Sequence, residues 1–559
     1  MSVTTDVPAC RQAGMKSVSN WYSSSSNYYS FKPSITPNQF TNFMTNLKSF
    51  SASVLLLVFL QLNAPAQKSS MLPRSVPEAE GVSSNSIIQF LDAAAKSKTE
   101  FHSFMLLRHG KVIAEGWWNP YRADLKHTLY SCSKSFTATA IGFAVQEKRL
   151  SLSDKVISFF PRDLPDTVSN YLSALTVKDV LMMSDGQEPD PTSAVASKDT
   201  NWIKGFLATP VIHDPGTQFL YNSLGTYMLS AIVQKVTGQK TLDYLKPRLF
   251  DPLGIHDEDW ETDLQSINTG GWGLRLKTED MAKFAELFLQ KGNWNGKQIL
   301  PASWVEEAGS MKITQDPNAP QSKKDSSDWL QGYCYQMWRC RHNAFRGDGA
   351  FGQFMIVMPE QDAALAITAE TPDMQEEINL VWQYLLPAFK NEKLPANADA
   401  VARLKEKIKS LALLLPAKHT EALETTINGK TFTATSNNIH LQNISFNFSN
   451  DVCHIKFQTD TAAYQVAFGA GKWQAAETNM PEPALTTAMI ENNSMIYPAK
   501  ITGSYTWKNA NTLELILRYI ESPHTETFTC HFNDNKLTME AARSFDYGKN
   551  KTVIEAEVK

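Results

Sequence analysis

Residues 130–137 read Tyr130-Ser131-Cys132-Ser133-Lys134-Ser135-Phe136-Thr137 and open a stretch typical of a helix that ends near Glu147. Ser131 would sit at the helix N-terminus, and Lys134 lies three residues later on the same face. A hydroxyl is a weak nucleophile unless a base removes its proton, and a lysine can be that base when its pKa is lowered. The helix N-terminus offers backbone N–H groups to a developing oxyanion. The segment therefore predicts a nucleophile and its base, although this spacing alone also fits a helix cap with a solvated lysine.

A second segment ends in Tyr221-Asn222-Ser223, just before an amphipathic stretch over 227–236. A tyrosine at the end of an extended run can point its hydroxyl into a cleft. A phenol near a lysine can relay a proton from the nucleophile to the leaving group. The alternative is an ordinary half-buried tyrosine whose hydroxyl is hydrogen-bonded.

A third segment, Arg346-Gly347-Asp348-Gly349-Ala350-Phe351-Gly352-Gln353, leads into a strand predicted over 353–358. Its glycines allow close approach of a substrate to the backbone. An edge strand here can bind an acyl group as an added strand, and one N–H can complete an oxyanion hole. The alternative is a simple turn.

In this order and spacing, the three segments resemble the serine β-lactamase/penicillin-binding-protein superfamily, and within it the class C-like serine hydrolases. The resemblance covers roughly residues 75–390. Ser131 to Lys134 match the S-x-x-K motif of that superfamily, and Tyr221-Asn222-Ser223 is similar to its Y-x-N motif. The stretches 175–186 and 247–255 support the match.

The resemblance implies roles for individual residues. Ser131 resembles the acylated nucleophile, Lys134 its proton acceptor and Tyr221 the tyrosine that shuttles the proton. The N–H of Ala350 is expected to join that of Ser131 in the oxyanion hole. The remaining expected substrate-binding residues are Asn222, Ser223, Gly347, Gly349 and Arg346. No metal or organic cofactor is implied.

Two departures from the superfamily pattern affect the expected substrate. Ser223 stands where the superfamily usually has Asn, and the third motif reads Gly347-Asp348-Gly349 without a leading cation. Penicillin-recognising members use that cation to hold a substrate carboxylate, and here Arg346 is the neighbouring cation that could replace it. An esterase or amide hydrolase is therefore favoured. A β-lactamase, a D-Ala-D-Ala carboxypeptidase and a non-catalytic binding or sensor protein on the same fold are the alternatives.

The expected fold of residues 67–392 is α/β (α+β), an antiparallel sheet flanked by helices beside a helical lobe. Hairpins are predicted at 104–114 and 353–369, and further helices at 279–290 and 374–386. Residues 393–425 are expected to form a helical linker. Short apolar runs between turns then predict a small antiparallel β domain over 426–559, which resembles the lipocalin-like modules of exported relatives. Its expected role is structural cover or oligomer contact.

The N-terminal region predicts export. Residues 44–66 combine Lys48, an apolar run over 54–60 and the small residues of Ala64-Pro65-Ala66, as in a secretory signal peptide. A single membrane anchor and a buried helix are the alternatives. We expect translation to start at Met44, with residues 1–43 either absent from the natural protein or a disordered leader. The expected location is periplasmic or extracellular, with no membrane span after cleavage.

Composition narrows the possible partners. The 559-residue chain carries a net charge of −4, which gives no electrostatic case for nucleic acid or an anionic membrane. The expected partner is a small-molecule or peptide-like acyl substrate, and the oligomeric state stays open. Six cysteines do not form a disulfide framework, although Cys334 could pair with Cys340 and Cys453 with Cys530. No Cys/His spacing matches a zinc site.

Overall fold

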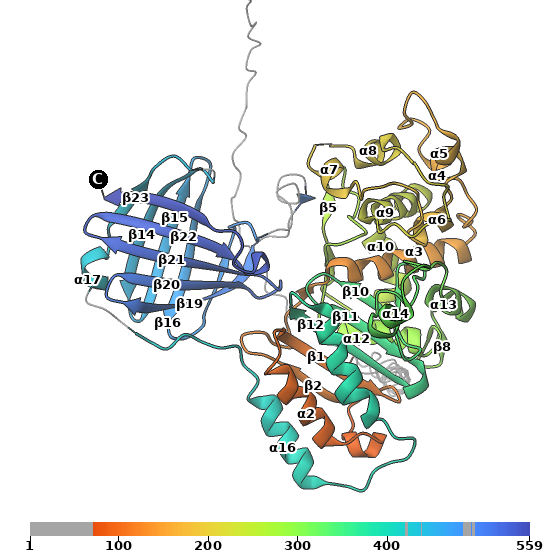
Figure 1. Ribbon diagram of the computed structural model, residues 1–559, viewed down its shortest axis with the longest axis horizontal. Helices are drawn as coiled ribbons and strands as arrows, with labels where there is room; N and C mark the ends of the chain where they lie inside the picture. The colour runs from red at the N-terminus through yellow and green to blue at the C-terminus, as the bar shows by residue number, and fades with distance from the viewer. Residues whose placement is uncertain are drawn as a thin grey trace, which may run out of the picture. The chain divides into compact units, whose positions relative to one another are not determined.

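Strands from residues 100–117 and from residues 338–370 pair into one antiparallel sheet, in the order β2-β1-β12-β11-β10-β9 (Figure 1). The computed structural model describes residues 71–198, 200–419, 423–437, 439–483, 493–494 and 498–558. The strands of this sheet are β1 (Glu100–Arg108), β2 (Lys111–Trp117), β9 (Trp338–Arg339), β10 (Phe345–Gly349), β11 (Gln353–Met358) and β12 (Ala363–Glu370). The predicted signal peptide and leader lie outside the described residues.

Both faces of this sheet are covered. Every residue of β12 is buried, and β1 is buried from Phe101 onward. One core cluster joins the sheet to α3, α9 and α12, and a second lies on the other face with α2, α15 and α16. Continuous burial explains why these strands read as apolar runs and not as strict alternation.

A helical lobe accompanies the sheet, with α4 to α9 gathered together in Figure 1. The helices are α2 (Ser84–Ala94), α3 (Ser133–Gln146), α4 (Val156–Phe159), α5 (Asn170–Ala174), α6 (Val177–Leu181), α7 (Thr192–Ala196), α8 (Trp202–Ala208), α9 (Ser223–Thr237), α10 (Thr241–Leu245), α11 (Asp251–Leu253), α12 (Thr278–Leu289), α13 (Ala302–Gly309), α14 (Gln321–Ser326), α15 (Met374–Leu380) and α16 (Ala398–Lys409). The short strands are β3 (His127–Thr128), β4 (Asp259–Trp260), β5 (Thr262–Asp263), β6 (Leu274–Leu276), β7 (Asn293–Trp294) and β8 (Lys297–Gln298). The expected sheet, flanking helices and lobe are confirmed.

Two helices illustrate how local sequence sets their ends. The side chain of Asn222 accepts a hydrogen bond from the N–H of Gly225 and so caps the start of α9, which ends at Gly238 in the left-handed conformation. The helix predicted over 374–386 is α15 only as far as Leu380. It continues as a π-helical segment, Val381–Leu385, ahead of Pro387.

A ten-stranded sheet forms the C-terminal β domain, and a parallel pairing of β16 with β19 closes nine of its strands into a barrel, while β17 pairs alongside β19. Its strands are β13 (Thr431–Ala434), β14 (Leu441–Ser449), β15 (Val452–Thr459), β16 (Ala463–Ala470), β17 (Gln474–Thr478), β19 (Ala499–Asn509), β20 (Thr512–Tyr519), β21 (Thr525–Asn533), β22 (Lys536–Arg543) and β23 (Thr552–Val558). Helix α17 (Leu423–Ile427) precedes them, and β18 (Asn493–Ser494) pairs with β5 instead. Apolar residues fill the barrel, so closure both removes sheet edges and makes a core.

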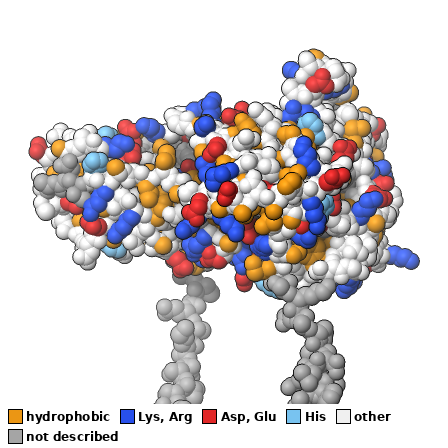
Figure 2. Space-filling view, turned by 90° about the horizontal axis from the view of Figure 1, so that it is seen from below, with side chains coloured by type: hydrophobic (Ala, Val, Ile, Leu, Met, Phe, Trp, Pro, Cys, Tyr) orange, Lys and Arg blue, Asp and Glu red, His pale blue; other side chains and the backbone are white. Residues whose placement is uncertain are grey.

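Cys334, Cys340, Cys453 and Cys530 are buried free thiols, so neither possible disulfide forms. In the described ranges, no helix is long and apolar enough to cross a bilayer. Acidic and basic side chains are interspersed over the face shown in Figure 2.

Candidate active site

Ser131 lies in a 3-10 turn, residues 130–132, that leads directly into α3. Its side chain is half-buried, whereas Lys134, one helical turn later, is only 1% exposed. The Lys134 Nζ is 3.0 Å from Ser131 Oγ, 3.0 Å from Ser223 Oγ and 2.8 Å from the carbonyl oxygen of Gly271. The structure therefore brings the expected nucleophile and base together, with the hydroxyl accessible and the amine beneath it.

Burial governs the charge of the Lys134 amine. It lowers the pKa of Lys134 from 10.5 to about 7, because a buried ammonium loses its hydration. A neutral amine has two N–H donors and one lone pair. The carbonyl of Gly271 can only accept, and Ser223 Oγ can accept the second N–H, which leaves the lone pair for the hydroxyl proton of Ser131. The three contacts thus suit a general base.

Tyr221 lies beside both Lys134 and Ser131. Lys134 Nζ is 4.9 Å from the centre of the Tyr221 ring, and that ring stacks on Trp338 with centroids 5.8 Å apart. Burial raises the pKa of Tyr221, an effect that its hydrogen bond with Ser131 opposes. The phenol is therefore protonated at neutral pH and is within reach of the proton that moves.

Asn222 has a different surrounding from the one predicted. Its side chain is fully buried, and its amide nitrogen donates to Asp185 at 2.9 Å and to Gln187 at 3.1 Å. Its amide oxygen caps α9. The expected contact with substrate is therefore corrected: Asn222 anchors the segment that carries Tyr221. Ser223 likewise contacts Lys134 within the protein.

The glycine-rich segment is a strand, β10, and not only the approach to one. Its pairing with β9 involves only Phe345 and Arg346, so 347–349 form an edge beyond that pairing. A Cβ at Gly349 would lie 2.2 Å from the carbonyl oxygen of Leu129, two residues before the nucleophile. Glycine is therefore required for β10 to lie this close to the Ser131 turn, which brings half-buried Ala350 to the same region.

Arg346 is placed away from the role expected for it. The side chain is fully buried, its Nε donates to Asp348 at 2.9 Å, and the guanidinium lies over the Trp329 ring at 4.3 Å. Burial raises the pKa of Asp348, and the charge of Arg346 opposes this. The cation is thus already paired within the protein, which corrects the expectation that it could hold a substrate carboxylate.

Sequence reasoning missed two contributors to the site. Gly271 supplies the carbonyl that receives an N–H from Lys134, and a Cβ there would lie 3.3 Å from the Lys134 Nζ. The glycine cluster Gly270-Gly271-Trp272-Gly273 signals a close backbone approach, which could have identified it. Trp338, the stacking partner of Tyr221, carries no comparable signal.

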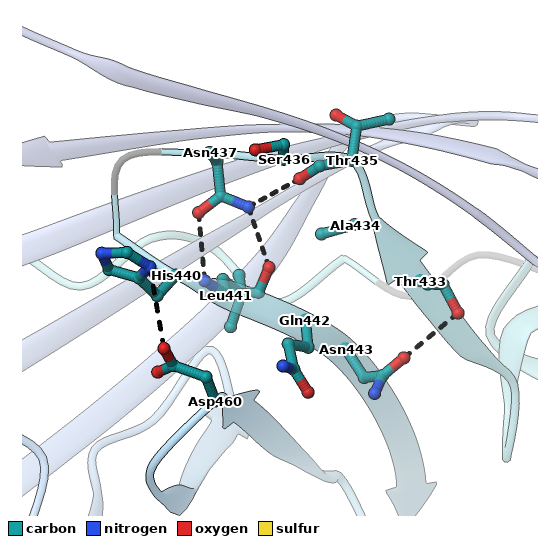
Figure 3. Close-up of a pocket in the computed structure, with 10 residues that line it drawn as sticks. All are labelled: Thr433, Ala434, Thr435, Ser436, Asn437, His440, Leu441, Gln442, Asn443 and Asp460. Atoms are coloured by element: carbon teal, nitrogen blue, oxygen red, sulfur yellow. Dashed lines mark hydrogen bonds and ion pairs between the residues drawn. The ribbon is translucent and has the colours of Figure 1, made fainter. Parts of the chain in front are cut away.

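Other candidate sites are weaker. The hollow in Figure 3 is lined by polar barrel residues, among them Asn437, His440 and Asp460, and by none of the predicted site residues. Its groups bond to one another: Asn437 to Leu441, and His440 to Asp460 at 3.7 Å. Among the described residues, no three His, Cys, Asp or Glu side chains gather as metal ligands would.

Comparison with known proteins agrees with this geometry. The family described as Beta-lactamase matches residues 95–386, more than half of the 559 residues. The chain therefore belongs to the Beta-lactamase family, within the superfamily of serine β-lactamases and penicillin-binding proteins, and is a serine hydrolase.

Three individual proteins show the degree of similarity to this chain. The 6-aminohexanoate-dimer hydrolase of Paenarthrobacter ureafaciens is 27% identical over 293 residues, covering 48% of this chain and 73% of that protein. Protein flp of Staphylococcus aureus (strain MW2) is 28% identical over 199 residues, covering 32% of this chain and 39% of that protein. The octameric penicillin-binding protein homologue from Pyrococcus abyssi is 15% identical with a TM-score of 0.43, covering 84% of this chain and 99% of that structure.

Proposed function

We propose that the protein hydrolyses an ester or a linear amide through an acyl-enzyme on Ser131. The observation that carries this proposal is the set of contacts around Lys134 Nζ, whose lone pair faces the Ser131 hydroxyl once the amine is neutral. A pKa of about 7 makes that neutral form abundant at physiological pH.

The reaction follows in two halves. Ser131 Oγ attacks the substrate carbonyl carbon while its proton passes to Lys134, and the carbonyl oxygen becomes an oxyanion held by the N–H groups of Ser131 and Ala350. The bond to the leaving group breaks as Tyr221 relays a proton to that group. Water then attacks the serine ester, the same groups move its proton in the reverse sense, and the acid is released with Ser131 restored.

A linear acyl substrate is favoured over a β-lactam or a D-Ala-D-Ala peptide. The cation nearest the third motif, Arg346, is fully buried and bonded to Asp348. A substrate carboxylate would have to displace that pairing, at the cost of leaving a buried carboxylate unpaired. The 6-aminohexanoate-dimer hydrolase among the relatives is named for a dimer of an amino acid, which supports an amide as one of the two substrate classes proposed.

The test compares three substrates: an activated ester, the 6-aminohexanoate dimer and a chromogenic cephalosporin. The wild type is expected to turn over the ester and an amide but not the cephalosporin. Intact-mass spectrometry should detect an acyl adduct that is absent from Ser131→Ala and present in the control Ser153→Ala, which changes an exposed serine. Rapid cephalosporin turnover would favour the β-lactamase alternative. The absence of any adduct or turnover would favour the sensor alternative and contradict the proposal.

We also propose that the enzyme acts outside the cytoplasm, after removal of residues up to 66. The support is the signal-like sequence at 44–66. Expression of the full gene in a bacterial host, followed by fractionation and N-terminal sequencing, should yield a periplasmic or secreted form that begins near Gln67. A cytoplasmic product with an intact N-terminus would contradict this.

A further inference from the structure

One loop of the barrel, residues 520–524 between β20 and β21, is buried against the hydrolase region. The exposed fractions of Glu521, Ser522 and His524 are 4%, 1% and 0%. The N–H of Thr128 donates to the Glu521 carbonyl at 2.8 Å, and the Tyr121 hydroxyl donates to the Ser522 carbonyl at 3.0 Å. The hydrolase region and the barrel belong to one compact unit, residues 69–559. This loop therefore meets the chain within three residues of the nucleophile.

His524 ends that loop and bonds to two residues of the hydrolase region. Its Nδ1 is 2.9 Å from Glu370 Oε1, and its Nε2 bonds to the Tyr130 hydroxyl. A carboxylate accepts, so Nδ1 carries the hydrogen in the neutral ring and Nε2 accepts from Tyr130. Burial raises the pKa of Tyr130, which keeps its hydroxyl protonated as a donor. Ser544 donates to the same Glu370 oxygen at 2.8 Å.

The His524 ring also packs against two aromatic side chains of the hydrolase region. Its centroid is 5.7 Å from that of Tyr130 and 4.9 Å from that of Phe351, and these two rings are 5.3 Å apart. Tyr130 immediately precedes Ser131, and Phe351 immediately follows Ala350. One imidazole thus contacts both neighbours of the two proposed oxyanion donors.

Both neighbours have a backbone conformation that L-residues rarely adopt. The φ angles of Tyr130 and Phe351 are +47° and +68°. Ala350 and Phe351 are the central residues of a turn closed by the N–H of Gly352 on the carbonyl of Gly349. Non-glycine residues remain in the left-handed region only where the surrounding structure holds them, and such positions cluster at functional sites.

We propose that His524 of the barrel is a positioning residue for the oxyanion hole, fixing the N–H groups of Ser131 and Ala350 through Tyr130 and Phe351. This inference rests on the proposed function. It gives the barrel a part in catalysis beyond covering the hydrolase region. The absence of this imidazole would let the two strained turns relax and move the donors apart.

The experiment uses the full-length chain with four variants. His524→Leu removes both hydrogen bonds at similar volume, and His524→Gln restores an acceptor near the Nε2 position. Tyr130→Phe removes only the hydroxyl. Tyr121→Phe is the matched control, because it removes a bond to the same barrel loop without touching Tyr130 or Phe351. Each variant is assayed on an activated ester, checked by thermal unfolding, and analysed by hydrogen–deuterium exchange of peptides covering 128–135 and 346–356.

His524→Leu is expected to lower kcat about 10- to 100-fold with KM changed less than about threefold, as displaced catalytic donors do. Tyr130→Phe should show a smaller loss, and His524→Gln a partial rescue, whereas Tyr121→Phe should keep wild-type kcat. Amide exchange in both peptides should quicken in His524→Leu but not in Tyr121→Phe. Unchanged exchange and kcat in His524→Leu, or equal losses in Tyr121→Phe, would overturn the inference.

The exchange result decides the inference even if the proposed function fails. That failure would show as a wild type without Ser131-dependent turnover, and the two peptides would still report whether His524 holds their backbone. Faster exchange in His524→Leu alone supports its positioning role, and unchanged exchange overturns it.

Discussion

Burial sets the protonation state of Lys134, because an ammonium with three N–H donors would fit the three surrounding oxygens as well as a neutral amine does. Three oxygens lie within 3.0 Å of the amine, and only Gly271 is restricted to accepting. Burial has the largest effect on the Lys134 amine and outweighs the opposing charges of Asp190 and Asp348, so its pKa falls to about 7. The same amine on an exposed helix face would stay charged and could not act as a base.

The activity should therefore depend on pH through Lys134. The active form is the neutral amine, so kcat/KM should fall about tenfold per pH unit below about 7 and level off above it. Measuring kcat/KM as a function of pH, in buffers that do not react with the substrate, tests this. Lys134→Arg keeps a charge at every accessible pH and should lose about 10³-fold or more in rate without a comparable inflection. A profile that is flat between pH 5 and 8 would contradict the assignment of Lys134 as the base.

At the scale of elements, the site depends on how closely β10 approaches the turn before α3. A Cβ added at Gly349 would lie 2.2 Å from a backbone oxygen, the carbonyl oxygen of Leu129. A Cβ added at Gly347 would instead lie near side-chain atoms, 2.6 Å from Met355 Cε and 3.1 Å from Ser135 Oγ. A side-chain end can rotate away, whereas a carbonyl held in a turn cannot, so the two glycines of one strand carry different constraints.

Gly349→Ala should accordingly be more disruptive than Gly347→Ala. We expect Gly349→Ala to lower the free energy of unfolding by about 1–3 kcal/mol, as overpacking does, and Gly347→Ala by less than about 1 kcal/mol. Gly349→Ala should also reduce kcat, because the strand must retreat from the Ser131 turn. Urea unfolding of both variants, with kcat on the activated ester, tests this. Equal stability losses would show that the close approach of β10 is not constraining.

At the scale of the molecule, the barrel and the hydrolase region are joined by buried polar contacts. Arg518 of β20 bonds to Glu100 of β1 at 3.0 Å, with side-chain exposures of 8% and 35%. Ile520 belongs to the apolar cluster on the face of the hydrolase sheet that packs against α2, α15 and α16. These contacts bury charge and apolar surface together, so we expect the two regions to unfold in one cooperative transition.

Breaking the Arg518 contact should destabilise the whole chain. We expect Arg518→Met to cost about 1–3 kcal/mol, less than for a fully buried pair because Glu100 is partly solvated. The control Lys508→Met removes a barrel lysine that pairs with Glu514 at 3.4 Å on the surface, and should cost less than about 1 kcal/mol. Calorimetry would reveal whether the transition stays single. A barrel that melts separately in the wild type would contradict cooperative unfolding.

Local features were predictable because their causes lie within one or two turns of chain. The spacing of Ser131 and Lys134 fixes them on one helix face, and Gly238 marks the end of α9, whereas the helix begins at Ser223 and not at the predicted residue 227. The paired strands at 100–117 and 353–370 follow from apolar runs separated by turn residues. The ordered motifs also carried the family resemblance, which the matched residues 95–386 confirm.

Only the tertiary structure decided which distant groups meet. The sequence by itself indicated the segment of the proposed nucleophile, several helices and strands and the β character of the last 130 or so residues, because periodicity and turn chemistry are local. It did not determine that Gly271 faces Lys134, that Arg346 is paired with Asp348, or that His524 reaches Tyr130. Those contacts depend on how whole elements pack, and packing is set by many residues at once and not by any single motif.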